Sequence, residues 1–278
     1  MKKYILVLLV AVAAWAPLYI FRNYQCPFKQ VLAPPVTEGK KTALPATDLS
    51  RSEDNFLNYL RLRKDVLALA EIEKILSLQP DDLSALWGKA EVLRRNYKFT
   101  ESERILNRIL ALSPCHAPAL ISLSYIRYHD GKLNDALRLL KAVLDNPDLD
   151  RKDRTLAYML MGSINAKRAA QGGLFSKIAY GTHVGGYFEK ARALAADLSE
   201  VHLGLGAFYL LAPKIVGGGL DKAIQELEIA VKLTPDFATA NARLAQAYKK
   251  KGDLEKYDFY LKQARGLDPE NEVLKEIE

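Results

Sequence analysis

Four prolines mark a repeat in this sequence. Pro80 and Pro114 are 34 residues apart, and so are Pro235 and Pro269. They close four similar stretches, which read LSLQP, LALSP, VKLTP and RGLDP in chain order. A fixed period of this length is typical of stacked helical hairpins, in which each hairpin leaves an apolar face that only its neighbour can cover. We therefore predict an all-α solenoid over residues 49–278.

Small and large side chains recur within each period. In residues 238–271 the marker residues are Leu244, Ala245, Tyr248, Leu261, Ala264 and Pro269. This arrangement resembles the tetratricopeptide repeat (TPR) family, in which the small residues let two helices approach closely and the larger ones fill the remaining space. Weaker matches begin near residues 49, 83 and 117. The resemblance implies a helical-hairpin solenoid of about six repeats that binds proteins or peptides in a concave groove.

Two repeats are longer than the period, with extra residues near 169–187 and 212–219. The second insert lies in the stretch YLLAPKIVGGGLDK, residues 209–222. A phosphate-binding loop needs G-x-x-x-x-G-K-[ST] after a strand, whereas Lys222 is followed by Ala223 and a helical pattern precedes the glycines. We interpret the stretch as a widened turn between two helices, with Asp221 as the N-cap of the second.

The inserts also resemble a feature of bacterial exported or membrane-anchored TPR proteins, in which a YLxAPxxVGG-like stretch interrupts one repeat. Loops on one rim of a solenoid are favourable places for specific contacts. Our candidate contact residues in these insert loops are His183, Lys214 and Lys222.

An uncharged apolar segment precedes the repeats. Residues 4–21 follow Lys2 and Lys3, and 18 residues at about 1.5 Å each span about 27 Å, enough for a bilayer core. We predict a transmembrane signal anchor over residues 1–26 and a flexible, proline-rich linker over residues 27–48. The solenoid would then be exported and held at the membrane on its periplasmic or other extracytoplasmic side. The alternative is a signal peptide cleaved after the A-x-A of residues 11–13, giving a secreted or periplasmic protein.

The sequence offers little support for catalysis, metal binding or nucleic-acid binding. The net charge of +7 is spread along the chain without a basic run, so no nucleic-acid partner is expected. Cys26 and Cys115 lie far apart, so we expect neither a disulfide nor a metal site. None of the four histidines stands at ligand spacing, and the patterns H-E-x-x-H and G-x-S-x-G are absent. We predict no cofactor, no metal and no enzymatic activity.

The TPR resemblance also implies which side chains line the groove, mainly from the first helix of each repeat. The resulting candidates for partner binding are Trp87, Glu91, Arg94, Arg95, Tyr125, Tyr128, His129, Lys167, Gln246, Lys249 and Lys250. Aromatic side chains interleaved with cations suit an extended peptide with apolar anchors and acidic groups. In the fifth repeat the same places carry Leu203, Ala207, Leu210 and Leu211, which would either close the groove or form an apolar pocket.

These observations favour a non-enzymatic, membrane-anchored interaction scaffold of the bacterial cell envelope. Its partner would be a protein or peptide bound through the groove and the insert loops. Two alternatives stay open. One is a ligand-handling accessory protein that resembles the TPR components of TRAP-type transporters, with an apolar pocket around residues 203–211. The other is an enzyme centred on the inserts.

Overall fold

The computed structural model describes residues 46–277. The expected anchor at residues 1–26, and all but the end of the expected linker, lie outside this range. Within it, no helix is both long enough and apolar enough to cross a membrane. Residues 46–48, which we assigned to the linker, already belong to the first described helix.

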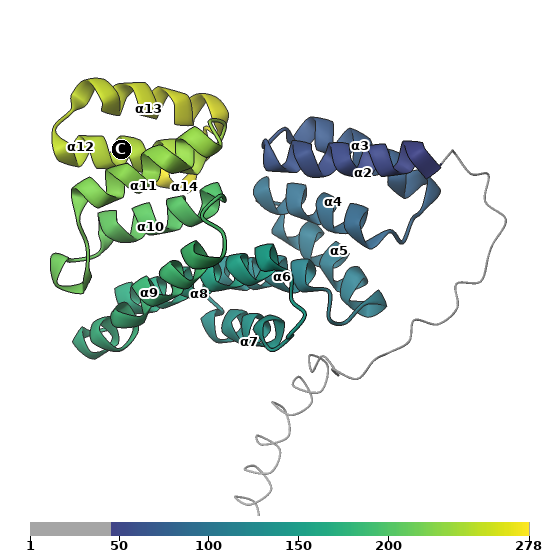
Figure 1. The fold of residues 1–278 in the computed structure, drawn as a ribbon, viewed down its shortest axis with the longest axis horizontal. Helices are drawn as coiled ribbons and strands as arrows, with labels where there is room; N and C mark the ends of the chain where they lie inside the picture. The colour runs from purple at the N-terminus through teal and green to yellow at the C-terminus, as the bar shows by residue number, and fades with distance from the viewer. Residues whose placement is uncertain (1–45, 278) are drawn as a thin grey trace, which may run out of the picture.

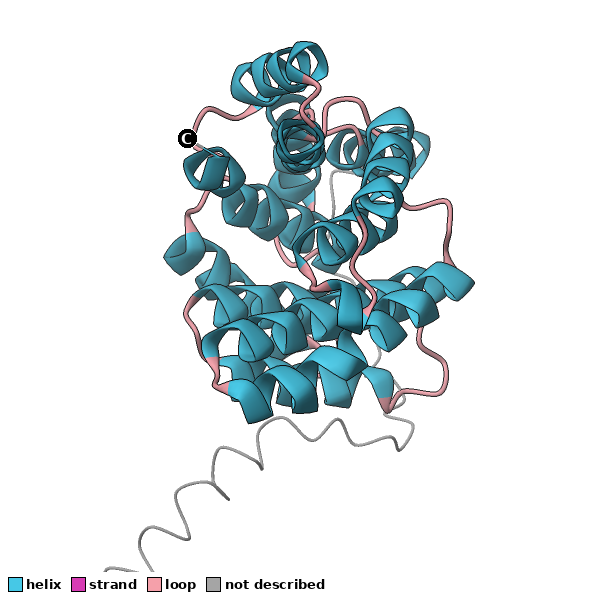
Figure 2. Cartoon of the chain, turned by 90° about the vertical axis from the view of Figure 1, so that its left-hand side faces the viewer, coloured by secondary structure: helices cyan, strands magenta, loops and turns pink. Residues whose placement is uncertain are grey.

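Helices and their connections make up all of residues 46–277 (Figure 2). Six successive hairpins are formed by α2 (Ala46–Arg61) with α3 (Asp65–Leu78), α4 (Leu83–Arg95) with α5 (Phe99–Leu112), α6 (Ala117–His129) with α7 (Leu133–Leu144), α8 (Arg151–Gln171) with α9 (Leu174–Leu194), α10 (Ser199–Leu211) with α11 (Leu220–Leu233), and α12 (Ala238–Lys251) with α13 (Leu254–Leu267). A short 3-10 helix, η1 (Lys214–Val216), lies between α10 and α11, and α14 (Glu272–Ile277) ends the described chain. The prediction of an all-α solenoid of about six helical hairpins is confirmed.

Local sequence signals set where the hairpins turn. The Asp82 side chain begins α4 by accepting a hydrogen bond from the Ala85 amide at 2.8 Å. The turns inside the third and sixth hairpins contain Gly131 and Gly252 at φ of 75° and 84°, a left-handed conformation that glycine adopts without a steric penalty. In the first two hairpins the corresponding turns contain Arg63 and Tyr97 instead, at φ of 60° and 58°.

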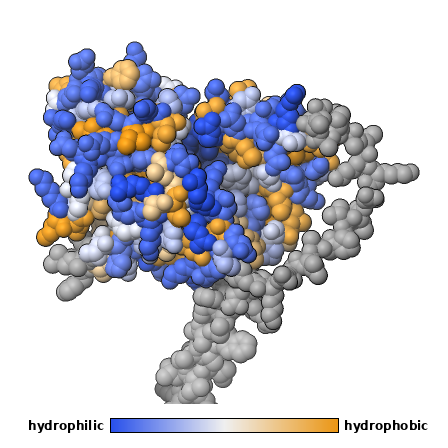
Figure 3. Space-filling view, in the orientation of Figure 1, coloured by the Kyte–Doolittle hydropathy of each residue, from blue (hydrophilic) through white to orange (hydrophobic). Residues whose placement is uncertain are grey.

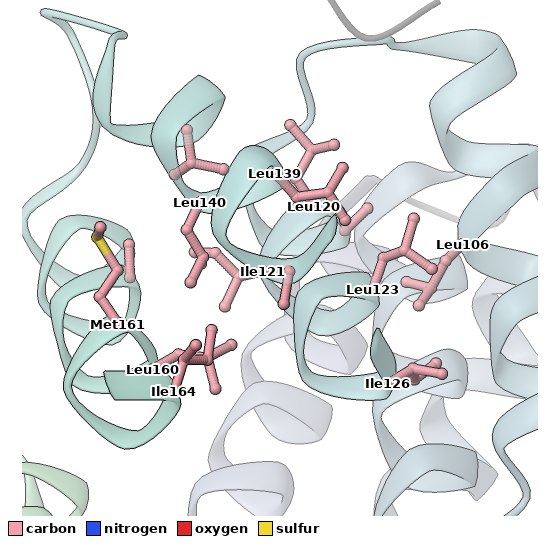
Figure 4. Close-up of a cluster of buried hydrophobic side chains, with 14 of the residues drawn as sticks. Leu106, Leu120, Ile121, Leu123, Ile126, Leu139, Leu140, Leu160, Met161 and Ile164 are labelled. Atoms are coloured by element: carbon pink, nitrogen blue, oxygen red, sulfur yellow. The ribbon is translucent and has the colours of Figure 1, made fainter. Parts of the chain in front are cut away.

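The largest hydrophobic core lies in the middle of the solenoid. Leucine and isoleucine side chains of α5, α6, α7 and α8 interdigitate there, and Figure 4 shows them converging on α6 from its neighbours. Leu120, Leu123 and Ile126 of α6 are at most 2% exposed. At the end of the solenoid, Val273 and Leu274 of α14 cover the apolar face of α12 and α13.

The hairpins follow a curved path that places two arms opposite each other (Figure 1). The first arm contains α2–α5, and the second contains α10–α14. The helices α6–α9 join them and form the base between them. The first helices of successive hairpins therefore face a common interior space, in which the candidate site lies.

The two inserts take different forms. The extra residues near 169–187 lengthen α8 and α9 to 21 residues each, with only Gly172 and Gly173 between them. The expectation of a loop there is wrong, and His183 lies within α9. Residues 212–219 connect α10 to α11 through η1. Gly219, rather than Asp221, is the N-cap of α11, so that prediction is also wrong.

The connection between α10 and α11 is a tightly packed turn. The Gly219 amide donates to the Tyr209 carbonyl at 2.9 Å, and the Gly218 amide donates to the Pro213 carbonyl at 3.1 Å. A Cβ atom on Gly218 would lie 1.8 Å from the Ala212 carbonyl oxygen, so only glycine fits there. The backbone amides of this turn therefore serve the turn itself.

Cys115 lies in the connection between α5 and α6. It is disulfide-bonded, so the expectation of an unpaired cysteine at this position is wrong.

Candidate functional site

A large groove runs between the two arms and over the base. Its volume is about 2280 Å³, and it is lined mainly by residues of α2, α4, α6, α8, α9, α10 and α12. Figure 3 shows the corresponding hollow between the arms on the face that Figure 1 presents. Of the predicted groove residues, Trp87, Glu91, Arg94, Arg95, Tyr125, Tyr128 and Lys167 line it. His129, Gln246, Lys249, Lys250, His183, Lys214 and Lys222 are not among its lining residues.

Glu91 is the centre of an ionic cluster on the groove wall. The Arg94 Nε donates to Glu91 Oε2 at 3.0 Å, and Arg94 Nη2 donates to Oε1. The Arg95 Nε lies 3.4 Å from Glu91 Oε1, and the Ser122 hydroxyl donates to Oε2 at 3.3 Å. Burial alone would raise the pKa of Glu91, but the charges of Arg94, Arg95 and Arg63 together hold it well below its usual range. Glu91 is therefore ionised and fixed by its neighbours.

Aromatic rings hold the neighbouring cations. The Arg94 guanidinium lies 4.0 Å from the Tyr125 ring centroid, and Lys167 Nζ lies 4.4 Å from the Tyr128 centroid. Lys167 also donates to the Tyr128 carbonyl at 3.0 Å. The Trp87 indole N–H donates to the Ser122 hydroxyl at 3.2 Å, which fixes its half-buried ring against the groove. The wall is thus an ordered, mixed aromatic and cationic surface.

His129 lies behind this wall and contacts the opposite arm. Its ring packs between Phe99 and Tyr125, with centroid separations of 5.1 Å and 4.6 Å. Its Nδ1 lies 3.4 Å from the Glu272 carboxylate of α14. Burial lowers the pKa of His129, while Glu272 opposes that shift. The side chain joins the third hairpin to the end of the second arm.

Of the three candidates on α12, two bind other helices and the third binds a neighbouring residue of α12 itself. Lys249 Nζ donates to the Ile277 carbonyl at 2.8 Å, and Lys250 Nζ donates to the Leu210 carbonyl at 3.1 Å. The Gln246 side-chain oxygen accepts from Arg243 Nη1 at 2.8 Å, and Arg243 also pairs with Glu276. These contacts attach α14 and α10 to α12.

The three insert candidates do not converge on one surface site. His183 Nδ1 lies 2.8 Å from the Ala179 carbonyl oxygen, within its own helix. Lys214 is exposed in η1, and Lys222 Nζ lies 5.7 Å from the Tyr209 ring centroid. This placement provides no grouped acid, base and nucleophile. No group of three metal-ligating side chains occurs in the part of the chain that the structure describes.

Two groove residues that the repeat pattern did not identify are Arg63 and Tyr97. Arg63 Nη2 lies 3.7 Å from Glu200 Oε1, and its guanidinium carbon lies 4.2 Å from the Phe237 ring centroid. Burial and the charge of Arg95 lower the pKa of Arg63 to about 10. Burial, with the carboxylates of Asp268 and Glu272, raises the pKa of Tyr97 to about 12. Both residues thus interact across the groove with the second arm.

The sequence itself contains a pattern that could have identified Arg63 and Tyr97. Arg63 and Tyr97 occupy turn positions where other hairpins have Gly131 and Gly252. A bulky residue held at positive φ is strained, which points to a role beyond the turn.

The part of the groove formed by α8, α9 and α10 is apolar. Its lining includes Phe188, Leu203, Ala207, Phe208 and Leu211. The Phe188 and Phe208 rings pack 6.0 Å apart, and the Leu211 side chain is 54% exposed. One groove therefore combines a cationic and aromatic wall with an apolar wall.

Comparison with known proteins supports the repeat assignment. No family model matches the chain. The chloroplastic tetratricopeptide repeat domain-containing protein PYG7 of Arabidopsis thaliana is 38% identical over 77 residues, which cover 28% of this chain. The match spans 24% of that relative's length.

Solved structures show the same fold at low sequence identity. A thermophilic TPR protein of Thermus thermophilus is 20% identical, with 70% of this chain and 95% of that chain covered and a TM-score of 0.56. Human IFIT1, in its dimer with m7Gppp-AAAA, is 18% identical, with 84% and 52% covered and a TM-score of 0.58.

Proposed function

We propose that this chain, which has the fold of tetratricopeptide repeat proteins and a 77-residue match to one of them, is a scaffold that binds a protein partner in the groove between its arms, without catalysis. The observation that carries this proposal is the lining of the groove, where Trp87, Tyr125 and Tyr128 stand beside Arg94 and Lys167. Rigid aromatic anchors and desolvated cations are the groups that dominate affinity at protein interfaces. The partner is an extended segment that carries both apolar and acidic side chains.

The dimensions of the groove favour a peptide segment over a small metabolite. Drug-sized ligands occupy pockets of roughly 300–1,000 Å³. This groove is about 2280 Å³ and open between the arms. It therefore accommodates several residues of a partner chain, with polar and apolar walls for different side chains.

The proposal includes the apolar segment at residues 4–21. We place the chain in a bacterial cell envelope, with this segment as a membrane anchor and the solenoid on the extracytoplasmic side. Residues 22–45 would then connect the anchor to α2, so that the groove meets partners near the membrane surface. Alkaline phosphatase fused after Glu278 tests the orientation, since the enzyme is active only when exported.

Site-specific photo-crosslinking tests partner binding directly. A photoreactive amino acid replaces Trp87 in the full-length chain, and a matched chain carries it at Leu112. Leu112 is 52% exposed on α5 and does not line the groove. We expect protein adducts from position 87 in intact cells and none of these adducts from position 112. Equal labelling from both positions, or no adduct at position 87, would contradict groove binding.

The apolar wall supports a second candidate function, the binding of an apolar small molecule. Phe208 and Leu211 line the groove, and Ile215, which also lines it, is 93% exposed. Native mass spectrometry of the gently purified full-length chain would detect such a molecule as added mass. An Ala207→Trp variant, which fills this wall, should lose that mass if the molecule lies there.

A further inference from the structure

Arg63 is a half-buried cation whose side chain makes no hydrogen bond to another described residue. Its side chain is 25% exposed, and it projects from the turn between α2 and α3 into the groove. A guanidinium carries five N–H donors. Within residues 46–277, no hydrogen bond from the Arg63 guanidinium is found, and its nearest carboxylate oxygen, on Glu200, is 3.7 Å away. The stacked Phe237 ring holds the group in place without satisfying any donor.

The surroundings of Arg63 are strongly cationic. Arg94 and Arg95 lie in the same wall, and the charge of each lowers the pKa of Arg63. Glu91 is already committed to those two arginines. Asp65 is likewise committed, because it accepts from Arg95 Nη1 at 3.1 Å. Neither carboxylate is therefore left to pair with Arg63.

Arg95 adds a second unsatisfied donor. Its Nε is the one buried side-chain nitrogen or oxygen without a hydrogen-bond partner in the described part of the chain. The carboxylate oxygen that faces it, Glu91 Oε1, lies 3.4 Å away and already accepts from Arg94, so this wall has more guanidinium donors than carboxylate acceptors. Guanidinium groups match carboxylates especially well because two parallel N–H groups can meet two oxygens.

We propose that Arg63, with Arg94 and Arg95 beside it, recognises an aspartate or glutamate side chain of the segment bound in the groove. This inference rests on the proposed function and specifies the chemistry of the partner. In the free chain Glu200 occupies the approach to Arg63, with one oxygen 3.7 Å from Nη2 and the other accepting from the Ser199 hydroxyl at 3.2 Å. The partner carboxylate displaces Glu200 and takes the Arg63 donors.

Substitutions of Arg63 and Glu200 distinguish recognition of a partner from a purely structural ion pair. If Arg63 and Glu200 only hold the arms together, removing either residue has the same effect. If Arg63 recognises a partner carboxylate, the two removals have opposite effects. Arg63→Gln removes the recognising group, whereas Glu200→Gln leaves Arg63 in place and removes its competitor. Glutamine keeps the length and polarity of both side chains.

The test uses an array of immobilised 12-residue peptides of random sequence, probed with the full-length chain in mild detergent. We expect peptides retained by the wild-type chain to be enriched in aspartate and glutamate. For a retained acidic peptide, Arg63→Gln should weaken binding at least fivefold, and Glu200→Gln should strengthen it about twofold to fivefold. Arg138→Gln, on the exposed surface of α7, is the control and should leave binding unchanged.

Several outcomes would overturn the inference. One is that the wild-type chain retains acidic peptides and their amide counterparts equally, and another is that Arg63→Gln and Glu200→Gln weaken peptide binding equally. The inference would also fail if the chain preferred phosphoserine to glutamate, or if the array retained no peptide. The cross-linking at position 87 decides the proposed function separately. Protein adducts there, combined with any of these outcomes, would leave the scaffold function standing and remove only the carboxylate subsite.

Discussion

Arg63 in the first hairpin stacks on Phe237, which directly precedes α12, with 4.2 Å between the guanidinium carbon and the ring centroid. The two residues are 174 positions apart in the sequence, and their contact joins the two arms across the groove. A linear stack of repeats would place contacts only between neighbouring units. The arms of this solenoid instead interact through side chains at the mouth of the groove.

A double-mutant cycle measures the strength of this contact. We expect Arg63→Gln and Phe237→Leu to show a coupling free energy of about 0.5–1 kcal/mol, because a partly desolvated cation over an aromatic ring contributes that much. The measurement is the free energy of unfolding from urea titrations of both single variants, the double variant and the wild type. Additivity within about 0.3 kcal/mol would show that the stacking contributes nothing to stability.

The Glu91 cluster predicts a pH-dependent effect. At pH 7 we expect Glu91→Gln to destabilise the chain by about 3–5 kcal/mol, because it leaves the buried charges of Arg94 and Arg95 without their counter-ion. The folded-state pKa of Glu91 is depressed, so its stabilisation is present above the unfolded value near 4.5 and is lost as the pH falls toward the folded value. Thermal unfolding at pH 7 and pH 3.5 should show the difference between variant and wild type shrinking at the lower pH.

Asp135→Asn provides the comparison for this experiment. Asp135 pairs with Arg138 on the exposed surface of α7, where both side chains are more than 40% exposed. Exposed pairs contribute about 0–1 kcal/mol, so this variant should unfold close to the wild type at both pH values. If Glu91→Gln destabilises the folded chain no more than Asp135→Asn does, Glu91 is not a fixed, buried anion.

Gly218 is predicted to tolerate no side chain. Its added Cβ would overlap the Ala212 carbonyl oxygen, so Gly218→Ala must rebuild the turn between α10 and α11. We expect a loss of at least about 2 kcal/mol in stability, measured by urea unfolding. Gly186→Ala in α9 is the matched control, since nothing lies within 4 Å of its added Cβ. This helical control should be neutral or stabilising by up to about 1 kcal/mol.

Lys249 is predicted to act in packing α14. Its ammonium group donates to the Ile277 carbonyl, so Lys249→Ala should expose the end of α14 and accelerate amide hydrogen exchange over residues 272–277. Lys251→Ala is the control, because the Lys251 side chain is 49% exposed near Asp221. If exchange in α14 is the same in both variants, the Lys249 contact does not hold this helix.

The sequence was sufficient for the parts of the fold that depend on neighbouring residues. Proline spacing and the alternation of small and large side chains are local signals, and they predict the six hairpins correctly. Residues 169–187 were misjudged because Gly181, Gly185 and Gly186 each lower helix propensity by up to about 1 kcal/mol. Packing of Val184 and Phe188 into a buried cluster favours the helix over that local preference.

The residues that line the groove were only partly predictable, because they depend on packing between parts of the chain that are far apart in sequence. The first-helix positions of the early repeats line it, but α14 occupies the corresponding face of α12 and takes up Lys249. The contacts of Arg63 with Glu200 and Phe237 depend on the accumulated curvature of several hairpins. No short stretch of sequence encodes that curvature, although the replacement of glycine by Arg63 and Tyr97 at two turns indicated that those turns differ.

The contacts between the arms also restrict how this chain can change in evolution. An open array can gain or lose a unit at little cost, because each unit touches only its neighbours. Here, deleting or duplicating one hairpin would rotate one arm relative to the other and carry Phe237 away from Arg63. The number of units in this molecule is therefore constrained by geometry, whereas the two inserts lengthen α8 and α9 and widen the turn between α10 and α11 without adding a unit.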